Sequence, residues 1–118
     1  MSIAEEWSRR SEEALSAANA IREITSIWAA FLMHQAVEFR LKGKWCGRGL
    51  QIPATHRLTR LVRGLDGGVA DEVILACVQL SNVYYARYPD RRSDTIQLKE
   101  SFGSVEVIFR WLEQESQK

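Results

Sequence analysis

The stretch Tyr84-Tyr85-Ala86-Arg87-Tyr88-Pro89-Asp90 closes a run of apolar residues with three aromatic rings, an arginine and a proline. Upstream of it, apolar side chains recur every three or four residues, the spacing of a helix that buries one face. The members of this stripe are Val69, Val73, Ala76, Cys77, Leu80, Val83 and Tyr84. Because Pro89 disfavours helical geometry at the residue before it, we expect a long helix to end here.

The same helical spacing recurs elsewhere in the chain, and no segment alternates in the manner of a strand between hairpin turns. The further helices are expected at roughly residues 3–21, 24–42, 58–63 and 98–112. The sequence therefore predicts an all-α fold, an antiparallel up-and-down bundle of four main helices plus one short helix, in a single domain over residues 1–118.

Glycine, proline and threonine residues predict where the helices end and begin. The glycines from Gly43 to Gly49 and the proline Pro53 should stop the second helix, and the Gly43 between Lys42 and Lys44 should shorten it. Thr55 is a candidate cap for the short helix.

Two of the predicted helices carry more apolar residues than one partner helix would cover. On the second helix the stripe is Ile24, Ile27, Trp28, Phe31, Leu32, Gln35 and Phe39, which makes this helix central or part of an interface. On the last helix Val107, Ile108 and Trp111 add to the stripe and suggest a second buried surface. His34, near the stripe of the second helix, is expected to be a core or interface histidine.

Composition limits the classes of function. A formal charge of +1 argues against a generally polybasic nucleic-acid binder, so an electrostatic function has to be local. No apolar run approaches the roughly 18 residues of a membrane span, and no signal peptide is recognisable, so we expect a cytoplasmic protein without a membrane contact. Cys77 on an apolar helix face is expected to be a buried thiol, which suits a reducing compartment.

The segment between Phe39 and Leu65 carries cations and no acidic residue. Its cations are Arg40, Lys42, Lys44, Arg48, Arg57, Arg60 and Arg63. Such a cluster would attract phosphate, although the acidic residues of the first helix could instead neutralise it, namely Glu5, Glu6, Glu12 and Glu13.

Two further residues, Arg87 and His56, have both a functional and a structural interpretation. Arg87, flanked by three tyrosines, is either a structural clamp or a ligand-binding group. His56, a loop imidazole beside cations, could hydrogen-bond a ligand or simply pack at a helix entry. The cysteines and histidines have neither the spacing of a metal site nor that of a nucleophilic triad, so we predict no metal ligand and no catalytic residue.

Three segments together resemble the HEPN domain family: Gln35 to Lys42 (QAVEFRLK), His56 to Leu61 (HRLTRL) and the run Arg87-Tyr88-Pro89-Asp90. The resemblance implies the same helical bundle. Ribonucleases of the family have an arginine followed by a histidine after four to six residues, whereas seven residues separate Arg48 from His56 here. The chain is therefore more similar to the non-catalytic, stand-alone members, which are encoded beside a minimal nucleotidyltransferase and commonly form homodimers.

On this resemblance we expect a non-enzymatic, homodimeric protein that binds a nucleotide such as ATP, needs no other cofactor, and serves a separately encoded minimal nucleotidyltransferase in a toxin–antitoxin-like pair. The resemblance supplies Lys42, His56, Arg87, Tyr88 and Asp90 as phosphate- or nucleotide-binding residues, and charge alone adds Arg40, Lys44, Arg57 and Arg91. The alternatives are a protein–protein adaptor without nucleotide binding and a metal-independent HEPN ribonuclease.

Overall fold

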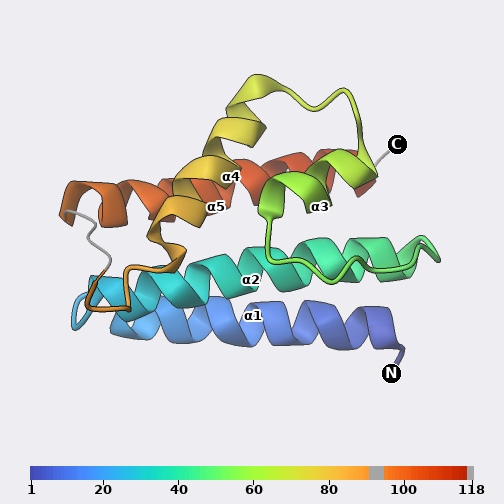
Figure 1. Cartoon of the computed structure of the whole chain (residues 1–118). Helices are drawn as coiled ribbons and strands as arrows, with labels where there is room; N and C mark the ends of the chain where they lie inside the picture. Colours follow the sequence, from blue (N-terminus) through green and yellow to red (C-terminus); the bar gives the residue numbers. More distant parts are fainter. Residues whose placement is uncertain (91–94, 117–118) are drawn as a thin grey trace.

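The computed structural model describes residues 1–90 and 95–116, and within them it contains five helices and no strand (Figure 1). The helices are α1 (Ile3–Ile21), α2 (Ser26–Gly47), α3 (Leu58–Leu65), α4 (Asp71–Tyr84) and α5 (Thr95–Ser116). The predicted all-α bundle of four long helices and one short helix is confirmed.

The helix α2 lies at the centre of the bundle. It forms an antiparallel hairpin with α1 and also contacts α3, α4 and α5, while α4 crosses α5 and packs against it (Figure 1). The main core therefore lies between α2 on one side and α3, α4 and α5 on the other, and it includes Leu41, Leu61, Leu80 and Ile108. The prediction that the second helix is central is confirmed.

The helix ends differ from the sequence-based expectations in two places. The helix α4 ends at Tyr84, well before Pro89, and the chain continues in a turn in which the Tyr88 amide donates to the Tyr85 carbonyl oxygen. Thr55 is not the N-cap of α3, because that position belongs to Arg57. The Thr55 hydroxyl instead accepts a hydrogen bond from the Arg57 amide at 3.1 Å, which fixes the loop just before α3.

The prediction that Gly43 shortens the second helix is wrong. The helix continues through this buried glycine to Gly47. A β-carbon at Gly43 would lie 2.9 Å from Cβ of Trp7, so the missing side chain lets α1 approach α2 closely. Packing between the two helices thus outweighs the low helix propensity of glycine, which amounts to about 1 kcal/mol.

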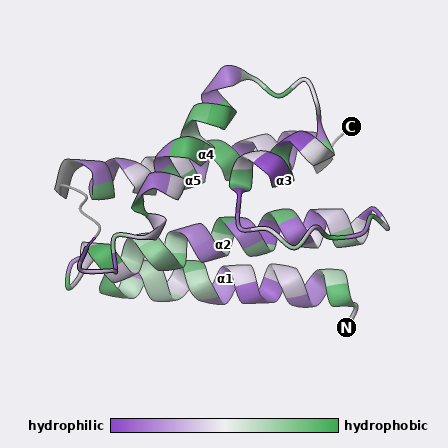
Figure 2. Ribbon diagram, viewed as in Figure 1, coloured by the Kyte–Doolittle hydropathy of each residue, from purple (hydrophilic) through white to green (hydrophobic). Residues whose placement is uncertain are grey.

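The predicted apolar stripe of α2 is wrong at its N-terminal end. Ile24, Ile27 and Trp28 are exposed, and Figure 2 shows hydrophobic residues at the end of the hairpin where α1 stops and α2 starts. The buried face of α2 consists of Ala29, Ala30, Met33, His34, Ala36, Val37, Glu38, Leu41, Lys42 and Gly43. The core-facing side of α2 therefore combines small and polar residues with Met33, Val37 and Leu41, whereas Ile27 and Trp28 face outward.

On α5, Ile108 and Trp111 belong to the core of the chain itself, and Val107 and Phe109 pack against it in part. The apolar surplus of this helix thus serves internal packing. Cys77 is buried, as predicted, and burial raises the pKa of its thiol to about 12. None of the helices in the described part of the chain is both long enough and apolar enough to cross a membrane.

The contact between Trp45 and Gly64 attaches α3 to α2. The indole Nε1 of Trp45 donates to the Leu61 carbonyl oxygen at 3.0 Å, and the ring covers Gly64 so closely that a β-carbon there would lie 2.1 Å from Cζ2. Replacing Gly64 by alanine should displace the ring and lower the free energy of unfolding by about 1–3 kcal/mol, measured by urea denaturation.

Gly67→Ala is the matched control, because a β-carbon at Gly67 meets no atom within 4 Å. We expect that variant to unfold close to the wild type. Equal midpoints for the Gly64 and Gly67 variants would show that the Trp45 ring does not constrain α3.

Candidate functional site

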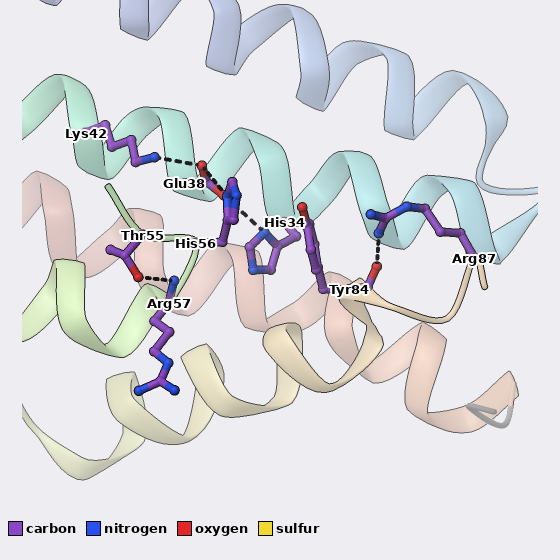
Figure 3. A network of polar contacts seen from close by, with 8 residues as sticks. All are labelled: His34, Glu38, Lys42, Thr55, His56, Arg57, Tyr84 and Arg87. Atoms are coloured by element: carbon purple, nitrogen blue, oxygen red, sulfur yellow. Dashed lines mark hydrogen bonds and ion pairs between the residues drawn. The ribbon is translucent and has the colours of Figure 1, made fainter. Parts of the chain in front are cut away.

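A line of polar and aromatic side chains crosses the centre of the bundle from α2 to the end of α4 (Figure 3). We call it the polar row, and its members are His34, Glu38, Lys42, His56, Tyr84 and Arg87. The first three come from one face of α2, His56 comes from the loop before α3, and the last two come from the C-terminal end of α4 and the turn after it.

Glu38 is the centre of the polar row. Its side chain is 2% exposed, and the Lys42 ammonium, one helical turn further along α2, lies 3.0 Å from Oε2. Residues four apart share a helix face, so the helix itself places this pair. A buried carboxylate without such a partner would cost several kcal/mol, and the pair thereby makes the burial of both charges tolerable.

His56 reaches the same carboxylate from outside the helix. Its Nδ1 lies 3.1 Å from both Glu38 oxygens, and its ring stacks on Tyr84 with the ring centres 6.1 Å apart. The side chain is nevertheless 64% exposed. One edge of the imidazole is therefore anchored inside the protein while much of the ring remains open to solvent.

His34 is a buried, neutral imidazole. Its Nδ1 lies 3.8 Å from Glu38 Oε1, beyond hydrogen-bond range, and has no hydrogen-bond partner in the structure. Burial, together with the electrostatic effect of the neighbouring His56, Arg87 and Lys42 side chains, lowers the His34 pKa to about 3. Its ring lies against Tyr84 at 4.2 Å between centres, so His34 serves as a packing residue.

Arg87 occupies an aromatic cage. Its guanidinium carbon lies 4.2 Å from the ring centre of Phe31 and 4.6 Å from those of Tyr84 and Tyr88, with Tyr85 at 5.9 Å. It also donates to the Tyr84 carbonyl oxygen and to the Tyr88 hydroxyl. These contacts bind the end of α4 to the start of α2, so the clamp interpretation is supported. Ligand binding by its other N–H groups stays a prediction.

The cations of the segment between Phe39 and Leu65, which we call the basic segment, do not form one patch. Lys42 is buried against Glu38, whereas Arg40 and Lys44 lie on a different face of α2, because a step of two residues is about 200° around a helix. Arg40 and Lys44 line a cleft of about 710 Å³ between α1, α2 and α5 that also contains Glu5 and Glu12. The structure therefore agrees with the alternative that acidic residues of the first helix neutralise these cations.

Arg48 turns away from the polar row. It donates to the Leu65 carbonyl oxygen at 3.0 Å and lies 3.7 Å from a carboxylate oxygen of Glu115 at the end of α5. It therefore shares no contact with His56 that would resemble an arginine–histidine pair of a ribonuclease.

The remaining predicted site residues lie near the outer edge of the polar row or beyond the described residues. Arg57 is exposed next to His56, Tyr88 is 47% exposed, and Asp90 is exposed in the turn after α4. Arg91 lies outside the described residues. In residues 1–90 and 95–116 there is no group of three His, Cys, Asp or Glu side chains that could hold a metal ion.

Comparisons with known proteins agree with the fold. The HEPN domain family model matches residues 4–115. The crystal structure of TT1696 from Thermus thermophilus is similar, with a TM-score of 0.82 and 25% sequence identity over 98% of this chain and 99% of that one. No curated protein matches.

Proposed function

The chain belongs to the HEPN domain family, and from that premise we propose that it binds a nucleotide at the outer edge of the polar row. We further propose that it acts, as a homodimer, with a separately encoded minimal nucleotidyltransferase in a toxin–antitoxin-like pair. It would then be the non-catalytic, nucleotide-binding subunit of that pair.

The observation that carries the nucleotide proposal is the orientation of His56. Its ring is held by the buried carboxylate of Glu38 on one edge and remains 64% exposed. A polar side chain that is fixed in this way loses little freedom when a ligand binds, so its contact is worth more than that of a mobile surface group. Preorganisation of this kind is typical of binding sites.

Two further exposed residues, Arg57 beside His56 in the sequence and Tyr88 beside Arg87, supply the other chemistry that a nucleotide needs under this proposal. The adjacent Arg57 is exposed and offers a charge to phosphate. The Tyr88 ring, 47% exposed and held by a hydrogen bond from Arg87 to its hydroxyl, offers a face for a base. For Lys42 we propose a positioning role in place of direct phosphate contact, because its ammonium pairs with Glu38 and has little exposed surface.

A protein–protein adaptor is the second candidate, and one observation favours it. Ile24 is 81% exposed and Trp28 is 50% exposed at the end of the α1–α2 hairpin, and Ile27 is partly exposed beside them. Apolar and aromatic residues gathered on a surface are typical of protein interfaces. The same surface would serve a transferase partner or a second copy of the chain.

Nucleotide binding is tested by calorimetric and thermal-shift titration of the purified protein with ATP, AMP, GTP and inorganic phosphate. Ligand at about 100 times its Kd should stabilise the fold by roughly 2.7 kcal/mol, a rise in Tm of several degrees. Tyr88→Ala and Arg57→Gln should each weaken binding about tenfold, because they remove a base-stacking ring and a phosphate charge.

Arg110→Gln is the matched control, since Arg110 is an exposed cation on α5 away from the polar row. It should bind nucleotide as the wild type does. If no nucleotide binds, the adaptor function is favoured. If Arg57→Gln and Arg110→Gln weaken binding equally, the interaction is diffuse charge attraction and the site is wrongly placed.

A further inference from the structure

The hydrogen bonds of His56 determine which of its nitrogens carries a proton. Nδ1 lies 3.1 Å from both oxygens of Glu38, and an ionised carboxylate can only accept hydrogen bonds. The Lys42 ammonium at 3.0 Å supports the ionised form, since an ammonium can only donate. The hydrogen must therefore sit on Nδ1 of His56.

This placement sets the chemistry of the exposed edge. A neutral imidazole carries one N–H and one acceptor nitrogen. In the neutral ring, a hydrogen on Nδ1 leaves Nε2 with a lone pair, on a side chain that is 64% exposed. A phosphate oxygen is also an acceptor, so neutral His56 cannot hydrogen-bond a phosphate through Nε2.

We infer that Nε2 of His56 accepts a hydrogen bond from a donor group of the nucleotide, a ribose hydroxyl or an amino group of the base, and that the phosphates lie elsewhere, toward Arg57. This inference rests on the proposed nucleotide binding. It makes His56 a specificity-determining residue, with Glu38 and Lys42 as the positioning residues that fix its tautomer. It also replaces the expectation that His56 binds phosphate.

The tautomer can be measured directly, without any ligand. The chain has two histidines, so long-range ¹H–¹⁵N spectra of the imidazoles are assigned by comparison with His56→Gln. Spectra should be recorded about two pH units above the ordinary imidazole pKa of about 6.5. We expect His56 to show a protonated Nδ1 and an unprotonated Nε2; a protonated Nε2 would overturn the inference.

A ligand panel then identifies the donor group. Calorimetric titrations compare ATP with 2′-deoxyATP, 3′-deoxyATP, inosine triphosphate and tripolyphosphate. Loss of the group that His56 recognises should weaken binding about three- to tenfold, the value of one hydrogen bond. The deoxynucleotides report on the two hydroxyls, and inosine triphosphate reports on the amino group.

Two variants separate recognition from charge. His56→Leu, whose side chain has no acceptor, should bind ATP and its analogues with nearly equal affinity. Arg57→Gln should weaken binding of the whole panel and keep the preference. Equal affinity of the wild type for all nucleotides would overturn this inference and leave the proposed function standing, whereas no binding by any nucleotide would overturn both.

Discussion

Replacing Lys42 by methionine is expected to lower the free energy of unfolding by about 3–5 kcal/mol. Methionine fills a similar volume, so the loss measures charge and not packing. Without the ammonium, the Glu38 carboxylate, 2% exposed, would keep only the hydrogen bond from His56. Urea denaturation followed by circular dichroism gives the free energy directly.

The matched control is Arg9→Met on α1. Arg9 and Glu13 also form an ion pair four residues apart, but both side chains are about half exposed. Water already solvates these charges, so we expect only a small change in stability. If the Lys42 variant is no less stable than the Arg9 variant, the buried ion pair of Lys42 and Glu38 does not stabilise the fold as predicted.

A second variant tests whether the loss comes from an uncompensated charge. Combining Lys42→Met with Glu38→Gln removes both charges from the interior, and such replacements are often close to neutral. The double variant should therefore recover much of the stability lost in Lys42→Met. If Lys42→Met instead folds normally and loses nucleotide affinity, Lys42 is a ligand-binding residue, as the sequence pattern predicts.

The long helices and the buried faces of α4 and α5 could be predicted from the sequence, because their apolar residues recur at helical spacing. On α2 the same approach misplaced the buried face. It predicted that Ile24 and Trp28 would be more buried than His34 and Glu38. A count of apolar residues does not take into account that a charged side chain can be paired. A carboxylate that is paired within its own helix can be buried, and only the tertiary structure shows that it is.

The components of the polar row are visible in the sequence as His34, Glu38 and Lys42, spaced four apart. That spacing does not identify a site, because the pairs of α1 have the same spacing and lie on the surface. The difference arises from α4 and the loop before α3, which bring Tyr84 and His56 over this face of α2. These contacts join residues far apart in the chain.

The number of cations in the basic segment that are available to bind phosphate was overestimated for a related reason. The segment carries no acidic residue within its own limits, but Glu38 lies just before it and Glu115 lies at the far end of the chain. These carboxylates pair with Lys42 and Arg48. Of the predicted phosphate- or nucleotide-binding residues, Arg57, Tyr88 and Asp90 are exposed near the polar row, and the aromatic cage holds Arg87.

Acid should destabilise this protein through His34. Its pKa is about 3 in the folded chain against an ordinary value of 6.5, chiefly because burial disfavours the imidazolium. Above pH 6.5 the imidazole is neutral in both states and the stability is complete. Between pH 6.5 and pH 3 only the unfolded state binds the proton, so stability falls as pH falls, by about 1.4 kcal/mol per unit, or about 3 kcal/mol by pH 4.

His34→Gln isolates this effect, because glutamine keeps a polar group there and does not titrate in this range. The groups around His34 that carry or can carry charge, namely Glu38, Lys42, His56 and Arg87, are present in both proteins. Urea denaturation from pH 7 to pH 4 should therefore give the wild type the steeper loss of stability. If the two proteins lose stability in parallel as the pH falls, His34 is protonated in the folded protein as well. The Nδ1 of a buried imidazolium would then need a hydrogen-bond acceptor, and Glu38 would have to supply it.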